Sequence, residues 1–167
     1  MIAAMLTDAD HIRNLLFRYA EAIDAGDIAA LRDLFEHAVI TLDGDATWRG
    51  RLAGGDDVQP GPWRATAHGG GPKGTKHIVS NVIVDIDAGG ETATTRSTFL
   101  VVQATDSMLL QPIISGRYHD GFRRIDGAWR FTSRRYIVDL VGNAAPLLDI
   151  GAGELEAMQR RATGWSA

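Results

Sequence analysis

Apolar residues recur at helical spacing in the first part of the chain. Between residues 12 and 23 they fall every three or four positions, which predicts an amphipathic helix capped by Thr7 or Asp8. A short turn, Asp24-Ala-Gly-Asp27, leads into a second apolar stripe that runs to Phe35. Two helices joined by so short a turn are expected to pack as neighbours.

The second half of the chain has the pattern of β-strands. After a short strand over residues 39–42 and an irregular stretch over 43–74, β-branched and aromatic residues dominate. Four strands are expected, over residues 75–86, 92–104, 110–125 and 128–139. The turns between them are short, and Asp126-Gly127 is a strong hairpin signal, so they should form an antiparallel meander. Apolar residues after Gly142 predict a terminal helix.

This order of elements predicts an α+β fold. A curved antiparallel sheet must bury one face, and the helices are the cover that the pattern offers. We therefore expect a cone-shaped barrel, with N-terminal helices packed on a curved, mostly antiparallel sheet that encloses a cavity. The 167 residues show no internal repeat and suit a single domain over residues 1–167.

Composition narrows the possible partners and the location. The net charge of −4 favours neither a nucleic-acid partner nor an anionic membrane. The absence of cysteine excludes disulfides and thiolate metal sites, and we expect no metal. The first residues lack the basic region of a signal peptide, and no apolar run approaches the length of a membrane span. A cytoplasmic location is therefore expected.

Residues 43–74 are long for a connection inside one domain. Such a stretch often lines or covers a site, which makes Trp48 a candidate ligand contact. One short helix near residues 56–58 fits the pattern. Gly69, Gly71 and Gly74 match the spacing G-x-G-x-x-G, but a strand follows where dinucleotide binding requires a helix. No cofactor is therefore expected.

Two polar residues interrupt the apolar pattern. Asp24 stands near the carboxyl end of the first helix, where the helix dipole disfavours a negative charge. It is either a turn residue or part of a site. His77 is expected to share one side of its strand with Val79, Asn81 and Ile83. Both sides of the strand are largely apolar, so His77 is either a satisfied core histidine or a base.

A polar group also stands on the third strand of the expected meander. Tyr118 and Asp120 share a face with apolar neighbours. Because buried charges are normally paired, they indicate either a structural network through Arg134 or Arg135, or a polar patch in the cavity. Tyr19, on the apolar stripe of the first helix, likewise needs a partner for its hydroxyl.

Three separated segments resemble one family in the same order. RYAEAIDAGDIAALRDLF, TKHIVSN and GRYHDGFRRIDGAWRF resemble the SnoaL-like branch of the nuclear transport factor 2-like superfamily. Within that branch they look most like scytalone dehydratase and hexachlorocyclohexane dehydrochlorinase. The resemblance spans roughly residues 12–139. It implies the cone-shaped fold, but this fold supports many chemistries.

The resemblance implies a catalytic pair. Asp24 matches the helix aspartate of both lyases, and His77 matches their strand histidine. Arg134 falls where the dehydrochlorinase has an arginine after Trp-x-Phe. Asp120 falls where scytalone dehydratase has a second histidine, and Ile23 replaces its tyrosine, which argues against scytalone as substrate.

These features predict a small-molecule lyase of the dehydratase type. His77 would remove a proton from carbon and Asp24 would orient it. Tyr19, Arg134, Trp48, Tyr118 and Asp120 are the expected contacts of a small hydrophobic or cyclic ligand. The alternatives are a non-catalytic ligand-binding protein or dioxygenase β-subunit-like protein, and an isomerase or cyclase on the same fold.

Oligomerisation is also expected. The expected strands carry apolar residues on both faces, more than helices on one side can cover. The residues concerned are Ile78, Val82, Val84, Leu100 and Val102. Together with the resemblance, they predict a homo-oligomer, a trimer in preference to a dimer.

Overall fold

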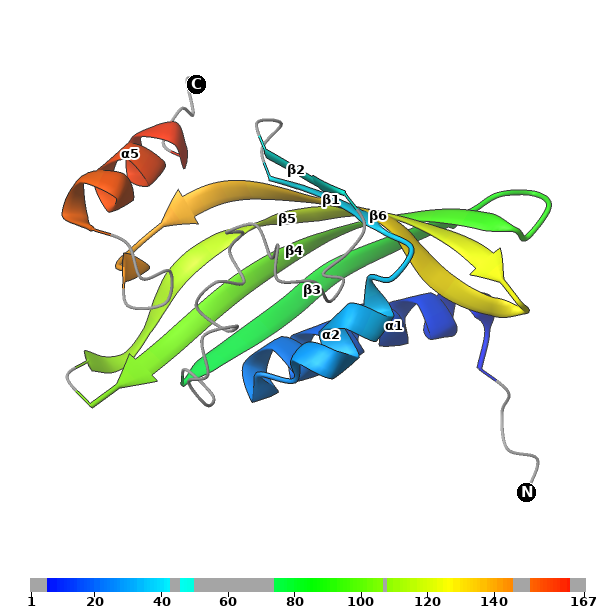
Figure 1. Ribbon diagram of the computed structural model, residues 1–167, viewed down its shortest axis with the longest axis horizontal. Helices are drawn as coiled ribbons and strands as arrows, with labels where there is room; N and C mark the ends of the chain where they lie inside the picture. The colour runs from blue at the N-terminus through cyan, green and yellow to red at the C-terminus, as the bar shows by residue number, and fades with distance from the viewer. Residues whose placement is uncertain (1–5, 43–45, 50–73, 107, 146–150, 163–167) are drawn as a thin grey trace.

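A computed structural model describes residues 6–42, 46–49, 74–106, 108–145 and 151–162 (Figure 1). Helix α1 (Asp8–Ala25) begins at Thr7, which forms a capping box with Asp10. It ends at Gly26, whose φ of 69° places it in the left-handed region that favours glycine. Asp27 then caps α2 (Ile28–Leu34) by accepting a hydrogen bond from the Ala30 N–H at 3.0 Å. Both predicted helices and their caps are confirmed.

The sheet has six strands in the described part of the chain, in the order β2-β1-β6-β5-β4-β3. The strands are β1 (Val39–Leu42), β2 (Ala46–Arg49), β3 (Thr75–Ile86), β4 (Thr92–Thr105), β5 (Met108–Ile125) and β6 (Ala128–Val141). Strands β3 to β6 form the predicted antiparallel meander, and β1 adds to β6 in parallel. The sheet is open, because β2 and β3 are edges that do not pair with each other.

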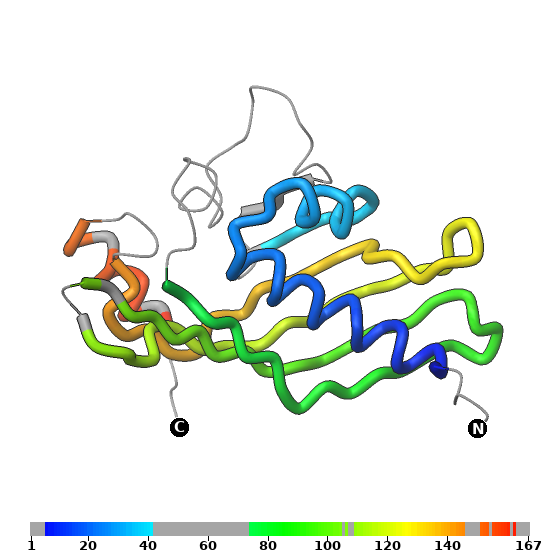
Figure 2. Tube along the Cα trace, turned by 90° about the horizontal axis from the view of Figure 1, so that it is seen from below, coloured from blue at the N-terminus to red at the C-terminus, as the bar shows by residue number. Residues whose placement is uncertain are grey.

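Helices α1 and α2 lie on one face of the curved sheet (Figures 1 and 2). The core fills the layer between them and is rich in aromatic rings, among them Tyr19 of α1, Phe35, and Phe131 of β6. At the other end of the chain, α5 (Ala152–Ala162) contacts β6, where the Gln159 amide donates to the carbonyl oxygen of Gly142 at 3.2 Å. The α+β fold and the terminal helix are thus confirmed.

Of two predictions on residues 43–74, the structure describes the residues that one of them concerns. Residues 46–49, expected to be irregular, form β2, in which Trp48 lies opposite Ile40 of β1. The short helix near residues 56–58 lies outside the described residues. Among the described helices, none is long and apolar enough to cross a membrane.

A β-bulge in β3 changes which side chains face the helices. The register with β4 shifts between Ser80 and Ile83, and Asn81 has a φ of 53°. Before the bulge the odd-numbered residues face α1; after it Val82 and Val84 pack against the core. The prediction that Ile83 shares a face with His77 is therefore wrong.

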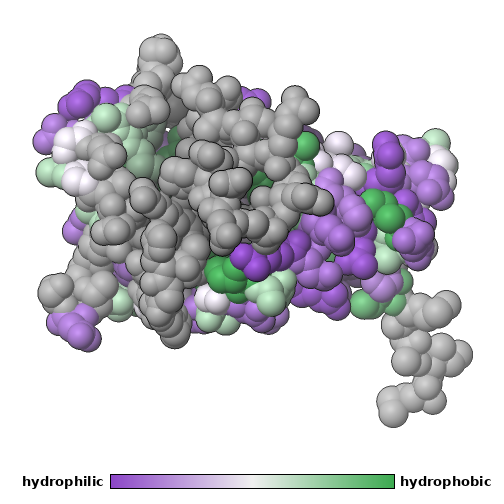
Figure 3. All heavy atoms as spheres, in the orientation of Figure 1, coloured by the Kyte–Doolittle hydropathy of each residue, from purple (hydrophilic) through white to green (hydrophobic). Residues whose placement is uncertain are grey.

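The bulge also bears on the predicted oligomer. Val82 and Val84 are partly buried against the core, so they add less apolar surface to the outer face than the sequence pattern predicts. Ile78 and Leu140 remain on the outside, 48% and 66% exposed. Figure 3 shows one face of the molecule, on which apolar side chains (green) and polar side chains (purple) are interspersed. The homo-oligomer stays a prediction.

Candidate functional site

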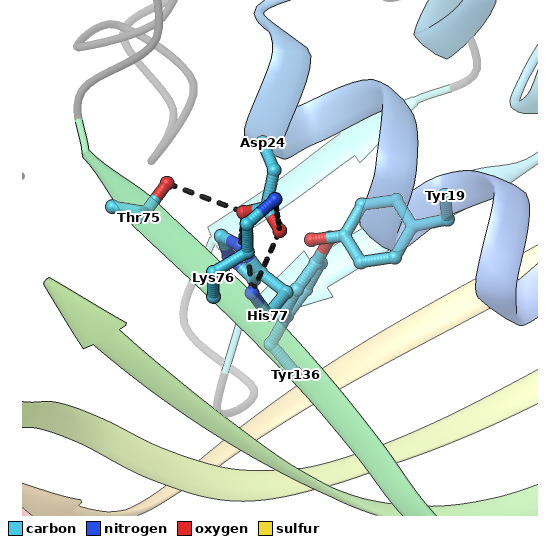
Figure 4. A network of polar contacts seen from close by, with 6 residues as sticks. All are labelled: Tyr19, Asp24, Thr75, Lys76, His77 and Tyr136. Carbon is cyan, nitrogen blue, oxygen red and sulfur yellow. Dashed lines mark hydrogen bonds and ion pairs between the residues drawn. The ribbon is translucent and has the colours of Figure 1, made fainter.

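Asp24 and His77 meet between the last turn of α1 and the edge strand β3 (Figure 4). The Asp24 carboxylate oxygen Oδ1 lies 2.7 Å from Nδ1 of the His77 ring. The same carboxylate accepts the backbone N–H of His77, at 3.0 Å to Oδ2 and 3.2 Å to Oδ1. The aspartate therefore holds the histidine at both its backbone and its ring.

Neighbours on β3 complete the surroundings of the carboxylate. The Thr75 hydroxyl donates to Oδ1 of Asp24 at 3.2 Å. The Lys76 ammonium lies 4.0 Å from Oδ2, but its side chain is 77% exposed, so solvent screens this contact. Asp24 itself is buried. An edge strand offers unpaired backbone N–H groups, and here the helix carboxylate takes one of them.

The surroundings of Asp24 keep it ionised. Burial by itself would raise its pKa, but hydrogen bonds from the His77 ring and backbone, the His77 charge and the Thr75 hydroxyl together lower the pKa below its ordinary value. A carboxylate can only accept hydrogen bonds, so in the neutral imidazole the proton lies on Nδ1. The lone pair is then on Nε2, where it can act as a base.

Three tyrosines gather beside this pair. Tyr19 of α1 packs edge-on against the His77 ring, with centroids 6.2 Å apart, and edge-on against Tyr118 of β5 at 5.9 Å. The Tyr136 hydroxyl, from β6, donates to the Tyr19 hydroxyl at 3.3 Å. All three are buried, and burial raises the pKa of each above its ordinary value.

Below the tyrosines lies a buried ion pair. Arg134 Nε donates to Oδ1 of Asp120 and Arg134 Nη2 donates to Oδ2, both at 2.8 Å, and both side chains are fully buried. The guanidinium carbon lies 4.2 Å from the Tyr19 ring centroid and 4.3 Å from that of Tyr118. Burial would lower the pKa of Arg134, but the charge and hydrogen bonds of Asp120 raise it well above its ordinary value.

A second β-bulge turns Arg134 inward. The register of β5 with β6 shifts between Gly121 and Phe122, where Thr132 is the additional residue on β6. As a result Phe131 and Arg134, three positions apart, are both buried. Regular alternation after Phe131 would instead have placed Ser133 inside.

The structure thus places the predicted site residues in two groups. Asp24, His77 and Tyr19 lie together, and Tyr118 joins them through Tyr19. Arg134 and Asp120 bind each other, which matches the structural network that the sequence left open. For Trp48 the described structure includes the backbone position in β2.

Two residues of the site were missed by sequence reasoning. The sequence pattern predicts Thr75 only as the first residue of a strand, and Tyr136 only as a residue within a strand. The signal for Tyr136 is its register: it lies opposite Tyr118, which is itself opposite Ser97. Among the described residues, no group of three or more His, Cys, Asp or Glu could hold a metal ion.

Comparison with known proteins establishes the family. Residues 4–135 match the SnoaL-like domain, so the chain belongs to the SnoaL-like family. No curated protein matches the sequence.

Solved structures share the fold. An NTF2-like protein with a cystatin-like fold from Novosphingobium aromaticivorans is 25% identical, with a TM-score of 0.62 over 95% of this chain and 90% of that one. A candidate scytalone dehydratase from the same organism is 22% identical, with a TM-score of 0.63 over 81% and 87%. The β subunit of a candidate aromatic-ring-hydroxylating dioxygenase, also from this organism, is 17% identical, with a TM-score of 0.62 over 83% and 93%. Similarities at this level establish the fold, and the chemistry has to be argued from the residues of the site.

Proposed function

We propose that this SnoaL-like protein is a small-molecule lyase of the dehydratase type, with His77 as the base and Asp24 as the residue that orients it. The observation that carries the proposal is the 2.7 Å contact between Asp24 Oδ1 and His77 Nδ1, made by a carboxylate that also holds the His77 backbone N–H. Two anchors fix the ring and its tautomer, which is what a general base requires.

The proposed reaction transfers one proton and expels one leaving group. Nε2 of His77 takes a proton from carbon, and the electrons of that C–H bond form the new C=C bond. The bond from the neighbouring carbon to its hydroxyl or chloride breaks, and the leaving group carries away the electron pair. A departing hydroxide takes the proton from the imidazolium and leaves as water. Asp24 stabilises the imidazolium in between.

Two features support a reaction of this kind. Asp24 is ionised, because hydrogen bonds from His77 lower its pKa despite burial. The His77 side chain is 9% exposed and the Asp24 side chain 7%, so little water competes with a substrate for the base. An isomerase or cyclase would use the same base, and the products distinguish these reactions from elimination.

The proposal is tested with a panel of cyclic β-hydroxy ketones and chlorinated cyclohexanes, with C=C formation followed by absorbance and mass spectrometry. Wild type should convert at least one compound. His77→Gln should lose roughly a hundred- to ten-thousand-fold in kcat/KM. Thr75→Ala is the control, because it removes a hydrogen bond to Asp24 and leaves the His77 contact in place.

Conversion that persists in His77→Gln would refute the assignment of the base. Binding of panel compounds with no conversion by wild type would favour the non-catalytic alternative. Double-bond migration with no loss of water or chloride would favour the isomerase.

A further inference from the structure

The outer face of the sheet, opposite α1 and α2, carries a row of basic side chains. Arg96 of β4, His119 of β5 and Arg135 of β6 lie directly opposite one another in register. The residue before each of them in the chain is buried in the inner layer, so alternation directs these three side chains to the outer face. Figures 1 and 2 show α1 and α2 on the other side of the sheet.

A second pair of cations lies further along two of these strands. Arg123 of β5 lies opposite Arg130 of β6, and each stands next to a buried phenylalanine, so both side chains also point outward. Residues directly opposite each other have Cβ atoms about 4.5–5.5 Å apart, and like charges at this spacing destabilise a sheet. Rows of facing cations therefore need anions that offset their repulsion.

Carboxylates of the protein neutralise only part of this charge. Five arginines of β4, β5 and β6 face outward, and three of them have a carboxylate partner. The pairs are Arg96 with Asp85 at 3.9 Å, Arg117 with Asp139 at 2.7 Å and Arg130 with Asp33 at 3.7 Å. Arg123 and Arg135 are exposed and form no ion pair with any described residue. Two positive charges on the outer face are thus left for an external anion.

Between the two basic rows lies a position without a side chain. Gly121 of β5 stands between Thr94 of β4 and Ser133 of β6. A Cβ atom added to Gly121 would lie 2.6 Å from the Ser133 hydroxyl oxygen and 3.1 Å from that of Thr132, the additional residue of the β-bulge. Two hydroxyls therefore converge over the glycine, and each can donate a hydrogen bond to an oxyanion.

The two unpaired arginines flank this glycine. Arg123 follows Gly121 by two positions on the same strand, which is about 7 Å. Arg135 is the diagonal neighbour of Gly121 on β6, because Ser133 is its direct partner. Diagonal neighbours are about 7–8 Å apart, within reach of long side chains. Both guanidinium groups can therefore meet an anion that lies over Gly121.

We propose that the outer face around Gly121 is a binding site for a phosphate group, held by Arg123 and Arg135 and by the hydroxyls of Thr132 and Ser133. A phosphate monoester carries a charge of about −1.5 to −2 at pH 7, which matches two unpaired arginines. Its oxygens accept the paired N–H groups of a guanidinium, a geometry that arginine favours over lysine.

The ligand class is a small phosphate monoester rather than a nucleic acid. Carboxylates stand at the margin of the basic surface, where Asp85 pairs with Arg96 and Asp139 pairs with Arg117. A nucleic-acid chain that continued from the site would meet these carboxylates and be repelled. The chain as a whole is also acidic, with a net charge of −4.

The phosphate site is separate from the proposed base and from the exposed apolar residues. Asp24 and His77 lie between α1 and β3, on the helix side of the sheet. Ile78 and Leu140 belong to the row of Leu100, six residues from Thr94 on β4, which is about 20 Å along the strand. A partner that covered this apolar row would leave the phosphate site open. The site is therefore tested independently of the lyase function.

The test is isothermal titration calorimetry with phenyl phosphate at constant ionic strength. Wild type should bind one equivalent in a saturable titration, and phenol should not bind at the same concentrations. Arg123→Gln and Arg135→Gln should each bind about ten- to a hundredfold more weakly, as expected for the loss of hydrogen bonds to a charged group. Ser133→Ala leaves the charge unchanged and should weaken binding by about two- to tenfold.

Arg13→Gln is the matched control. It also removes one arginine charge, but from α1 on the other side of the sheet, where Arg13 pairs with Asp10 at 3.4 Å. This variant should bind phenyl phosphate as wild type does. Circular dichroism confirms that every variant is folded. Decathymidylate and phosphatidylcholine vesicles that contain phosphatidic acid are titrated in parallel, and neither should compete with phenyl phosphate.

Several results would overturn the proposal. No saturable binding by wild type, or unchanged binding by Arg123→Gln and Arg135→Gln, would show that no phosphate site exists on this face. An equal loss in Arg13→Gln would reduce the effect to net charge. Competition by decathymidylate or by the vesicles would replace the small monoester with a nucleic acid or a membrane surface as the ligand. Unchanged binding by Ser133→Ala would contradict the role of the hydroxyls.

Discussion

Replacing Asp24 by Asn separates the role of this carboxylate in the fold from its role in the proposed chemistry. With its oxygen in place of Oδ2, the amide still accepts the His77 backbone N–H, which lies 3.0 Å away, and its nitrogen takes the place of Oδ1, which accepts from the Thr75 hydroxyl at 3.2 Å. What it loses is the charged acceptor for His77 Nδ1 at 2.7 Å. A hydrogen bond to a charged group contributes about 1.5–3 kcal/mol and a neutral one about 0.5–1.5, so unfolding should become easier by about 1–2 kcal/mol.

The effect on rate should be far larger. An amide N–H directed at Nδ1 favours the tautomer with the proton on Nε2, which removes the lone pair that would accept the substrate proton. We expect kcat/KM to fall about a hundred- to ten-thousand-fold. Thr75→Ala should destabilise the protein by a similar 1–2 kcal/mol, because it loses one hydrogen bond to the same carboxylate, and should keep most of the activity.

The assay combines urea denaturation with turnover per folded molecule for wild type, Asp24→Asn and Thr75→Ala. Equal activity in the two variants would refute the reasoning, since stability and rate would then follow the same structural loss. The pH dependence of stability provides a second readout. The folded pKa of Asp24 is lowered, so its stabilising contribution is fully present above the unfolded pKa and is lost as pH falls through the folded pKa. The stability difference between wild type and Asp24→Asn should therefore shrink below about pH 4.

Three further predictions concern the inner layer. Asp120→Asn should lower the free energy of unfolding, measured by urea denaturation, by about 3–5 kcal/mol, because it leaves the Arg134 charge buried without its partner. The double replacement Asp120→Leu with Arg134→Met should restore most of this loss. An equally unstable double variant would contradict this. Gly116→Ala should cost about 1–3 kcal/mol by overpacking, since an added Cβ would clash with the backbone carbonyl oxygen of Ile137 and stand 2.8 Å from the Phe99 ring. Near-ultraviolet circular dichroism should change with it, and wild-type stability would contradict the close approach. All three tyrosines are buried and have raised pKa values, so their stabilising contribution is present below the unfolded pKa and is lost as pH rises above about 10. Tyrosinate absorbance should therefore appear together with unfolding. Titration of any tyrosine near pH 10 in the folded protein would be inconsistent with the structure.

Local signals in the sequence were enough to predict most of the elements. Thr7, Gly26 and Asp27 cap the helices where turn and capping chemistry placed them. The Asp126-Gly127 turn has positive φ angles at both residues, 50° and 77°, as a two-residue hairpin requires. Each of these features depends on neighbours within a few positions, so the sequence pattern contains the information.

Features that depend on distant strands were not predictable in this way. The bulges at Asn81 and near Thr132 each add one residue on one strand. Beyond each bulge, the side chains therefore point to the opposite face of the sheet from the one that regular alternation predicts. For this reason Ile83 was placed on the wrong face, and alternation by itself gave no reason to place Arg134 inside. Trp48 lies on β2, which pairs with β1, and β1 pairs in parallel with β6. A parallel pair is not joined by a tight turn, so no turn residue in the sequence predicts it.

The same distinction between local and long-range signals applies to the residues of the site. Asp24 and His77 are 53 positions apart, and their contact was predicted by resemblance to a family rather than by spacing. A structural network through Arg134 was one of two alternatives for Asp120, and the register that places these two residues directly opposite each other agrees with it. For Tyr136 the only signal is its register opposite Tyr118, and its contact with the Tyr19 hydroxyl depends on how α1 packs on the sheet.

The most direct test of the central claim is hydrogen–deuterium exchange at the carbon next to the carbonyl of a cyclic ketone in D2O, followed by NMR. This measurement detects proton removal even where no leaving group is present. Wild type should accelerate exchange for at least one ketone of the panel, Thr75→Ala should do so to a similar extent, and Asp24→Asn and His77→Gln should lose most of the acceleration. Exchange as fast with His77→Gln as with wild type would contradict the account of this site as a histidine–aspartate base.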